Sequence, residues 1–307
     1  MSRRRILLAA IAMVCALTGL SAQQTRPTIR SGVDVVIVPV SVTEKDRPVR
    51  GLTSSDFTLR DNGVAQDFSC AAADSLAVDV TLVIDTSGSV KGKALEQFTA
   101  DVQRIAESLR PNDRLRLITF AGDASDVSGL QPGGVSLPLD RISAGGATSL
   151  YNALAASLMA SPHSDRPQLV FGFSDGLDNM SFLDASGLAS LAGYSHAVLY
   201  LTLVSDPMRL ESPNAPPRQS GRFVPYNGGP NRRLLNETAT RTGGAVFQRT
   251  AGASLSALFE QALDEFRSSY VLTFTPRGVG AAGRHTLTVT TKDPVHRLRW
   301  RKGYEGG

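Results

Sequence analysis

The stretch VTLVIDTSGSV at residues 80–90 joins an apolar, β-branched run to one acidic residue and two serines. The apolar run over 80–84 predicts a short buried strand. Residues 92–109 then place apolar side chains three and four positions apart, which is typical of an amphipathic helix. Pro111-Asn112-Asp113 ends that helix, and residues 114–120 predict the next strand. This part of the chain therefore predicts a strand–helix–strand unit.

The same alternation continues along the chain. Further helices are predicted at 148–158, 184–191, 234–240 and 255–266, and further strands at 168–173, 196–204 and 245–248. Strands that alternate with helices indicate βαβ units, in which helices cover both faces of a mostly parallel sheet. The predicted fold class is therefore α/β with a doubly wound, Rossmann-like sheet. Residues 206–231 are rich in Pro, Gly, Arg and Asn and predict one long exposed loop.

Both ends of the chain lack helices and predict β structure. Residues 33–43 are apolar and β-branched, residues 56–59 predict a second strand, and Asp61-Asn62-Gly63 is a hairpin turn signal. Near the other end, strands are predicted at 270–275, 284–291 and 295–301. We expect the two ends to pair into a small β-sandwich-like domain in which the α/β domain is inserted. The alternative is two unrelated β extensions that pack separately.

The first 22 residues predict a signal peptide. Arg3, Arg4 and Arg5 precede an apolar stretch over 6–20, and Leu20-Ser21-Ala22 offers a small-residue cleavage site. We expect export to the periplasm, the cell surface or the medium, and no membrane span after cleavage. An uncleaved N-terminal anchor and a twin-arginine signal are the alternatives.

Composition limits the classes of partner. The chain has 307 residues, of which 42% are hydrophobic and 20% charged, so we expect a globular protein without long disorder. Removal of residues 1–22 takes away three arginines and no acid, which lowers the net charge from +4 to +1. Without a Lys/Arg cluster, nothing favours nucleic-acid binding. After cleavage Cys70 is the only cysteine that remains, so no internal disulfide is expected. We expect its thiol to be buried.

Polar side chains follow the first strand of the α/β part, and they can converge on one point. Asp85, Ser87 and Ser89 alternate along the chain, and alternate residues of an extended backbone project to the same side. Thr148 follows a Gly-rich loop, and Asp175 follows another buried strand. Loops at the carboxyl ends of parallel strands share one crevice, so these groups can meet there. Hydroxyl and carboxylate oxygens suit Mg²⁺, Ca²⁺ or Mn²⁺, although a Ser/Gly turn capped by an Asp gives the same motif.

With these three elements in this order, the sequence resembles the von Willebrand factor A domain and its metal-ion-dependent adhesion site. The resemblance covers about residues 78–268 and depends on DxSxS, a Gly-rich loop with Thr, and a strand ending in Ser-Asp-Gly. The flanking segments VSVTEKDRPVRGLTSSDFTLRDNG (40–63), YVLTFTP (270–276) and RKGY (301–304) resemble a bacterial exported subgroup. The expected domains are a signal peptide over 1–22, β regions over 23–77 and 269–307, and the A domain over 78–268.

The resemblance implies a role for each residue of the site. Ser87 and Ser89 would bind a divalent cation through their hydroxyls, and Thr148 would bind it directly or through water. Asp85 and Asp175 would hold it mostly through bound waters. The first candidate is Mg²⁺, with Ca²⁺ or Mn²⁺ as alternatives, and a carboxylate of a protein partner would fill the open position. Asp178 and Asn179 are either a supporting layer or solvated loop residues.

The remaining readings are weaker. Gly172 to Gly176 matches the GxSxG of a serine hydrolase with Ser174 as nucleophile, but a nucleophile elbow needs a helix where 177–182 predicts a loop. The Gly-rich run over 86–92 lacks the Lys-Ser/Thr of a phosphate-binding loop, so we expect no nucleotide. The sequence therefore predicts a non-enzymatic, metal-dependent binding protein. A structural envelope module without metal dependence stays open as the alternative.

Overall fold

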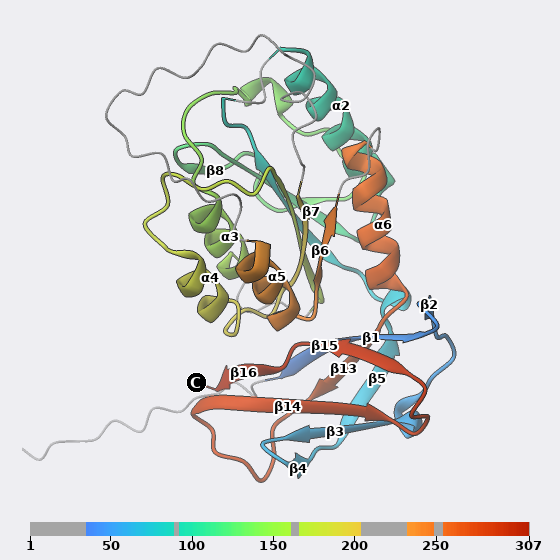
Figure 1. Ribbon diagram of the computed structural model, residues 1–307. Coiled ribbons are helices and arrows are strands. Elements are labelled where there is room, and N and C mark those ends of the chain that lie inside the picture. Colours follow the sequence, from blue (N-terminus) through green and yellow to red (C-terminus); the bar gives the residue numbers. More distant parts are fainter. Residues whose placement is uncertain (1–34, 89–91, 161–165, 204–231, 249–253, 307) are drawn as a thin grey trace, which may run out of the picture. The chain divides into compact units, whose positions relative to one another are not determined.

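The computed structural model describes residues 35–88, 92–160, 166–203, 232–248 and 254–306 (Figure 1). The predicted signal peptide, Ser89 and the predicted loop over 206–231 therefore lie outside the described residues. Within those residues, no helix combines the length and the apolar character needed to cross a membrane.

A seven-stranded sheet forms the centre of the α/β unit, in the order β12-β11-β10-β6-β7-β8, with β9 also paired to β7. Five strands are parallel: β6 (Asp79–Asp85), β7 (Arg114–Phe120), β10 (Gln168–Ser174), β11 (Val198–Leu203) and β12 (Ala245–Gln248). All five match strands predicted from the sequence. The antiparallel edge strands β8 (Ala124–Asp126) and β9 (Gln131–Pro132) were not predicted, since they are short and exposed and carry no apolar run.

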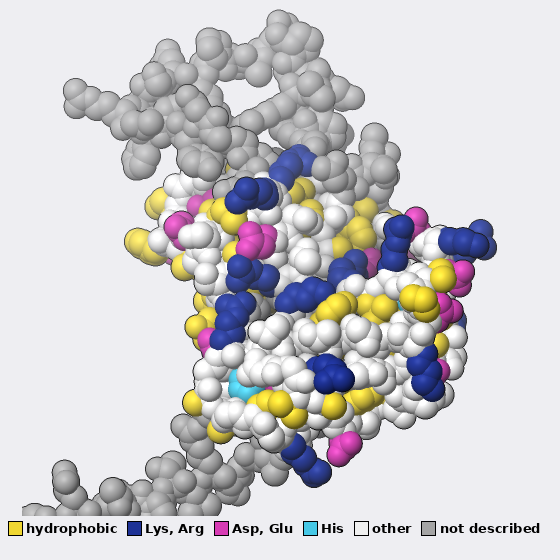
Figure 2. All heavy atoms as spheres, turned by 60° about the horizontal axis from the view of Figure 1, so that its bottom comes forward, with side chains coloured by type: hydrophobic (Ala, Val, Ile, Leu, Met, Phe, Trp, Pro, Cys, Tyr) yellow, Lys and Arg dark blue, Asp and Glu magenta, His cyan; other side chains and the backbone are white. Residues whose placement is uncertain are grey.

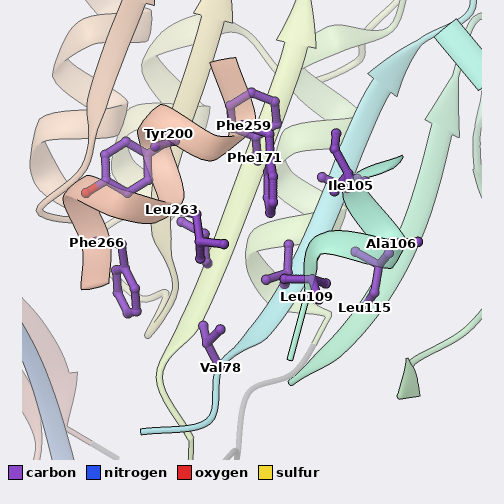
Figure 3. Close-up of a cluster of buried hydrophobic side chains, with 14 of the residues drawn as sticks. Val78, Ile105, Ala106, Leu109, Leu115, Phe171, Tyr200, Phe259, Leu263 and Phe266 are labelled. Atoms are coloured by element: carbon purple, nitrogen blue, oxygen red, sulfur yellow. The ribbon is translucent and has the colours of Figure 1, made fainter. Parts of the chain in front are cut away.

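Helices cover both faces of this sheet. The helices α2 (Lys93–Ser108) and α6 (Leu255–Arg267) lie on one face, and α3 (Leu150–Met159), α4 (Ala185–Leu191) and α5 (Arg232–Arg241) lie on the other (Figure 1). Alternate residues of β6 divide between the two layers: Leu82 and Ile84 pack with α2 and α6, whereas Val83 packs with α3. Figure 3 shows the first layer, in which the rings of Phe171 and Phe259 meet edge to face with centroids 5.5 Å apart.

The two ends of the chain form two antiparallel sheets. One has the order β15-β1-β13-β5, with β2 on β1, and the other has the order β16-β14-β3-β4. Their strands are β1 (Val36–Glu44), β2 (Arg47–Pro48), β3 (Phe57–Asp61), β4 (Val64–Ala65), β5 (Phe68–Ala72), β13 (Tyr270–Phe274), β14 (Gly283–Thr291), β15 (Arg297–Trp300) and β16 (Gly303–Gly306). Short 3₁₀ helices lie at Ser54–Asp56, Ala73–Ser75 and Leu139–Arg141.

Strands from opposite ends of the sequence pair directly within this β unit. The strand β1 pairs with β13 and β15, and β3 pairs with β14. Inward side chains of both sheets share one core, in which Val38, Leu59 and Leu272 are fully buried. The predicted fold class is therefore confirmed: an α/β domain is inserted in a β-sandwich built from both ends. The alternative of two separately packed extensions is wrong.

Candidate metal centre

Asp85 is the last residue of β6, so it lies at the carboxyl edge of the parallel sheet. Its side chain is buried, and its Oδ1 accepts a hydrogen bond from the backbone N–H of Ser87 at 2.9 Å. The backbone N–H and the hydroxyl of Thr86 both donate to the carbonyl of Phe120, at 2.8 and 3.1 Å. The turn that follows β6 is thus fixed to the neighbouring strand, and Asp85 and Ser87 have defined positions.

The neighbouring strand β10 brings a hydroxyl to the same carboxylate. The Ser174 hydroxyl, at the end of β10, donates to Asp85 Oδ2 at 2.8 Å and accepts from the N–H of Gly176 at 3.1 Å. Asp175 is half-buried, and its Oδ1 accepts from the N–H of Leu177 at 2.9 Å. Both oxygens of Asp85 therefore already accept protein hydrogen bonds, which orients this carboxylate and favours contact with an ion through water.

The Gly-rich loop meets both of these turns. Gly145 N–H donates to the Thr86 carbonyl at 2.9 Å, and Gly88 N–H donates to the Gly146 carbonyl at 3.3 Å. Gly146 has φ +88°, a conformation that favours glycine. The contact that brings the first and second loops together thus depends on the glycines that the sequence places there.

Thr148 joins this loop to the segment after β10. Its N–H donates to Asn179 Oδ1 at 2.8 Å, and its carbonyl accepts from the N–H groups of Asn179 and Met180 at 3.0 and 3.1 Å. Asp178 Oδ2 accepts from the N–H of Tyr151 at 2.9 Å. The interpretation of Asp178 and Asn179 as merely solvated loop residues is therefore wrong, because both side chains accept hydrogen bonds from backbone N–H groups at the start of α3. The sequence offers no signal for these bonds, which join residues about thirty positions apart.

The donor set suits a small, hard cation. Thr148 is buried, yet in the part of the chain that the structure describes its Oγ1 makes no hydrogen bond, while its backbone is bonded on both sides. The described residues contain no group of three or more His, Cys, Asp or Glu side chains that could hold a metal. The predicted ligand set is of another type, because it has only two carboxylates and completes them with hydroxyl groups. Carboxylate and hydroxyl oxygens are ligands that suit Mg²⁺, Ca²⁺ and Mn²⁺.

A cavity of about 450 Å³ adjoins these loops. Thr86 and Gly145 form its border with the candidate centre, and Asp123, Asp126 and Arg141 contribute charges to its wall. Polar and charged groups thus continue from the centre onto the neighbouring surface.

The hydrolase reading of Ser174 has no geometric support. Its hydroxyl is bonded to Asp85, and no helix begins before Ala185 in the loop that follows. His196 precedes β11 and so lies at the amino edge of the sheet, opposite Ser174, where its Nδ1 accepts from Arg301 Nη1 at 3.2 Å. A triad built on Ser174 and His196 is therefore not assembled.

Comparison with known proteins agrees with the fold. Residues 80–177 match the von Willebrand factor type A domain. This match contains Asp85, Ser87, Thr148 and Asp175, and it confirms the von Willebrand A domain predicted from the sequence. No curated protein matches the chain in sequence.

Several solved structures are similar to this chain. BatB from Bacteroides thetaiotaomicron, a conserved hypothetical protein, shares 18% identity over 62% of this chain and 98% of its own, with a TM-score of 0.47. A von Willebrand factor type A structure from Catenulispora acidiphila shares 12% identity over 91% of this chain and 64% of its own, with a TM-score of 0.46. Proximal thread matrix protein 1 from the mussel byssus, with a zinc-occupied MIDAS motif, shares 15% identity over 66% of this chain and 49% of its own, with a TM-score of 0.45.

Proposed function

We propose that the chain binds a protein partner through a divalent cation held at the carboxyl edge of the α/β sheet. Von Willebrand A domains are generally protein-interaction modules without enzymatic activity. The observation that carries the proposal is the interlocking of three loops, in which both oxygens of Asp85 accept hydrogen bonds while, among the described residues, the Thr148 hydroxyl makes none.

The proposed ligands are the hydroxyls of Ser87, Ser89 and Thr148, with Asp85 and Asp175 acting mainly through water. Mg²⁺ is the first choice, and Ca²⁺ or Mn²⁺ would fit the same oxygens. The cation would supply a positive charge with one open position, which attracts a carboxylate of the partner. Ser174 and the Ser87 N–H orient the Asp85 carboxylate, which supports its role as a ligand that acts through water.

We propose further that the protein works outside the cytoplasm, in the periplasm, at the cell surface or in the medium. The support is the arginine-led apolar segment over 3–20 and the small residues at 20–22. Detection of the protein in periplasmic or extracellular fractions, with Edman sequencing of its N-terminus, tests this. A start near Gln23 is the expected result, and an intact Met1 in the cytoplasm contradicts it.

Thermal unfolding in EDTA and in Mg²⁺, Ca²⁺ or Mn²⁺ tests the metal site. A ligand that binds only the folded state raises the unfolding free energy by about 2.7 kcal/mol at a hundredfold excess over its dissociation constant. We expect the wild type to gain stability in this way and Asp85→Ala to lose the gain while it still folds.

Asp123→Ala is the matched control, because Asp123 is an exposed acid in the wall of the adjoining cavity. It should keep the response of the wild type. If millimolar metal does not change the unfolding temperature of either the wild type or Asp85→Ala relative to EDTA, the metal site is refuted. A structural module without metal dependence then becomes the better interpretation.

A further inference from the structure

The loop between β10 and α4, residues 175–184, exposes two large apolar side chains. Phe182 is 99% exposed and Met180 is 54% exposed. Single exposed apolar residues are common in proteins. Figure 2 shows that the apolar side chains on one face of this molecule form small, separate groups among polar ones. Exposure alone therefore does not indicate a binding surface. The hydrogen bonds that fix this loop are the further evidence.

Hydrogen bonds fix the loop on both sides of Phe182. The Ser181 hydroxyl accepts from the N–H of Asn152 at 3.0 Å, and the N–H of Leu183 donates to Asn152 Oδ1 at 3.2 Å. Ser181 also donates to Asp178 Oδ2 at 2.6 Å, and the Leu183 side chain packs against the core under α3. One residue of the first turn of α3 thus binds both neighbours of Phe182, and Phe182 projects between them into solvent.

The end of the loop is fixed as well. Asp184 caps α4, and its Oδ1 accepts from the N–H of Gly187 at 2.7 Å. These backbone and hydroxyl hydrogen bonds hold the pKa of the Asp184 carboxyl below its ordinary value, so the cap stays charged at neutral pH. The exposure of Phe182 is therefore a fixed feature of the fold.

This loop is continuous with the candidate metal centre. It begins at Asp175, and Asn179 and Met180 bind the carbonyl of Thr148. Asn152 lies in the first turn of α3, which begins at Leu150, two residues after Thr148. A protein that places a carboxylate at the centre would therefore reach Met180 and Phe182 with its neighbouring residues.

We propose that Phe182, with Met180 beside it, is the apolar anchor for a protein partner that presents an acidic side chain flanked by apolar ones. The proposal rests on the proposed function, since the acidic side chain is the one that would meet the cation. The fixed backbone sets where the ring stands, and an aromatic side chain with only two rotatable bonds loses little conformational entropy on association, so such residues commonly dominate an interface. The fold gains no burial from Phe182, so its loss should affect binding and leave stability unchanged.

Peptide selection on the full chain provides the test. The probes are phage-displayed peptides randomised around one central Asp, selected in Mg²⁺ on the wild type and, in parallel, on Phe182→Ser. Peptides enriched on the wild type are synthesised with a fluorophore, and their affinities are measured by anisotropy. We expect apolar residues next to the Asp and at least about a tenfold loss of affinity for Phe182→Ser.

Two variants control for trivial effects. Tyr194→Ser removes a half-exposed aromatic side chain elsewhere on the surface. Tyr194 precedes β11 and so lies at the amino edge of the sheet, and this variant should bind the peptides like the wild type. Thermal unfolding of Phe182→Ser should match that of the wild type. A lowered melting temperature would overturn the view that this side chain serves only binding.

The same peptides separate this inference from the proposed function. Loss of binding in Phe182→Ser together with loss in EDTA and in Asp85→Ala supports both. Loss in Phe182→Ser alone supports the anchor and contradicts the metal site. Equal binding to Phe182→Ser and the wild type, or a selection that enriches no peptide on the wild type over Phe182→Ser, overturns the anchor.

Discussion

Two buried polar clusters in this molecule contain similar side chains but differ in how completely their polar groups are hydrogen-bonded. One is the candidate metal centre, where Asp85 accepts from Ser174 and from the backbone of Ser87. The other lies in the β-sandwich, where Asp61 accepts from the Tyr304 hydroxyl at 2.6 Å and lies 2.8 Å from Nδ1 of His285. Each is built around a buried aspartate at the end of a strand.

The clusters differ in whether their polar groups are satisfied. In the sandwich, Asp61 has partners on both oxygens, and the rings of His285 and Tyr304 stack with centroids 4.4 Å apart. This arrangement joins β3, β14 and β16. In the candidate metal centre, by contrast, the Thr148 hydroxyl has no partner among the described residues. Burial of polar groups therefore does not by itself indicate a binding site, and unused bonding capacity points to one only where other candidate ligands lie at the same edge of the sheet.

The largest expected effect comes from the closed cluster. Asp61→Ala leaves His285 and the Tyr304 hydroxyl buried without their acceptor, so we expect the unfolding free energy to fall by about 3 to 5 kcal/mol. Urea unfolding in EDTA measures this loss. Asp67→Ala, at a nearly fully exposed acid in the same β unit, is the control and should change little.

Asp61→Ala should also leave the response to metal intact. Addition of Mg²⁺ should stabilise this variant as much as the wild type, because Asp61 lies in a separate core. A variant that keeps its stability but loses the metal response would reverse the roles assigned to the two clusters.

The second effect concerns the open cluster. Thr148→Val keeps the shape of the side chain and removes only the hydroxyl, so we expect unchanged stability in EDTA. We expect about a tenfold weaker affinity for the cation, which corresponds to about 1.4 kcal/mol. Isothermal titration with Mg²⁺ measures the affinity.

Thr202→Val makes the same chemical change at a fully enclosed hydroxyl that also has no partner within the residues the structure describes. It should leave the cation affinity at the wild-type value. If Thr148→Val binds metal like the wild type, Thr148 is not a ligand.

The contrast between the clusters also shows what the sequence can predict. In the candidate metal centre, Asp85 and Asp175 stand at the ends of strands with clear apolar runs, and parallel strands bring their carboxyl ends together, so these two residues could be placed on one edge beforehand. Asp61 and His285 are 224 positions apart and meet only through the pairing of β3 with β14. No local pattern indicates that contact, and His285 therefore appeared only as a residue of a terminal strand.

Short or exposed segments were missed for a related reason. The predicted strand over 295–301 ends at Trp300, and the chain turns through Arg301 and Lys302 into β16, which belongs to the other sheet. The predicted strand includes Arg301, and nothing in the run RWRKGY (299–304) indicates that this arginine is buried, although it is only 2% exposed. What buries this arginine is the packing of distant segments, because Nη1 donates to His196 and the nearby Gly243 approaches its backbone.

Arg301 combines the features of the two clusters, and it gives the smallest of the expected effects. It is enclosed like Asp61, but Nη2 has no partner within the described part of the chain, and Nε donates to the Gly303 carbonyl at 3.0 Å. Burial lowers the pKa of Arg301 to about 10, so the folded state holds this proton less tightly than the unfolded state does. The charged form therefore opposes folding at every pH below about 10, and this cost decreases only as the pH rises above that value.

Arg301→Met removes the buried charge and keeps most of the volume, so we expect the unfolding free energy to rise by about 1 kcal/mol. Because pH 7 and pH 9 both lie below the shifted pKa, the gain in urea unfolding should be equal at the two values. Arg297→Met, at an exposed arginine of the preceding strand β15, should give no gain. A loss of stability in Arg301→Met would mean that its bonds to His196 and Gly303 outweigh the cost of the buried charge. Arg301 would then belong with the satisfied cluster of the sandwich, and incomplete satisfaction would mark a binding site only where solvent can reach the group.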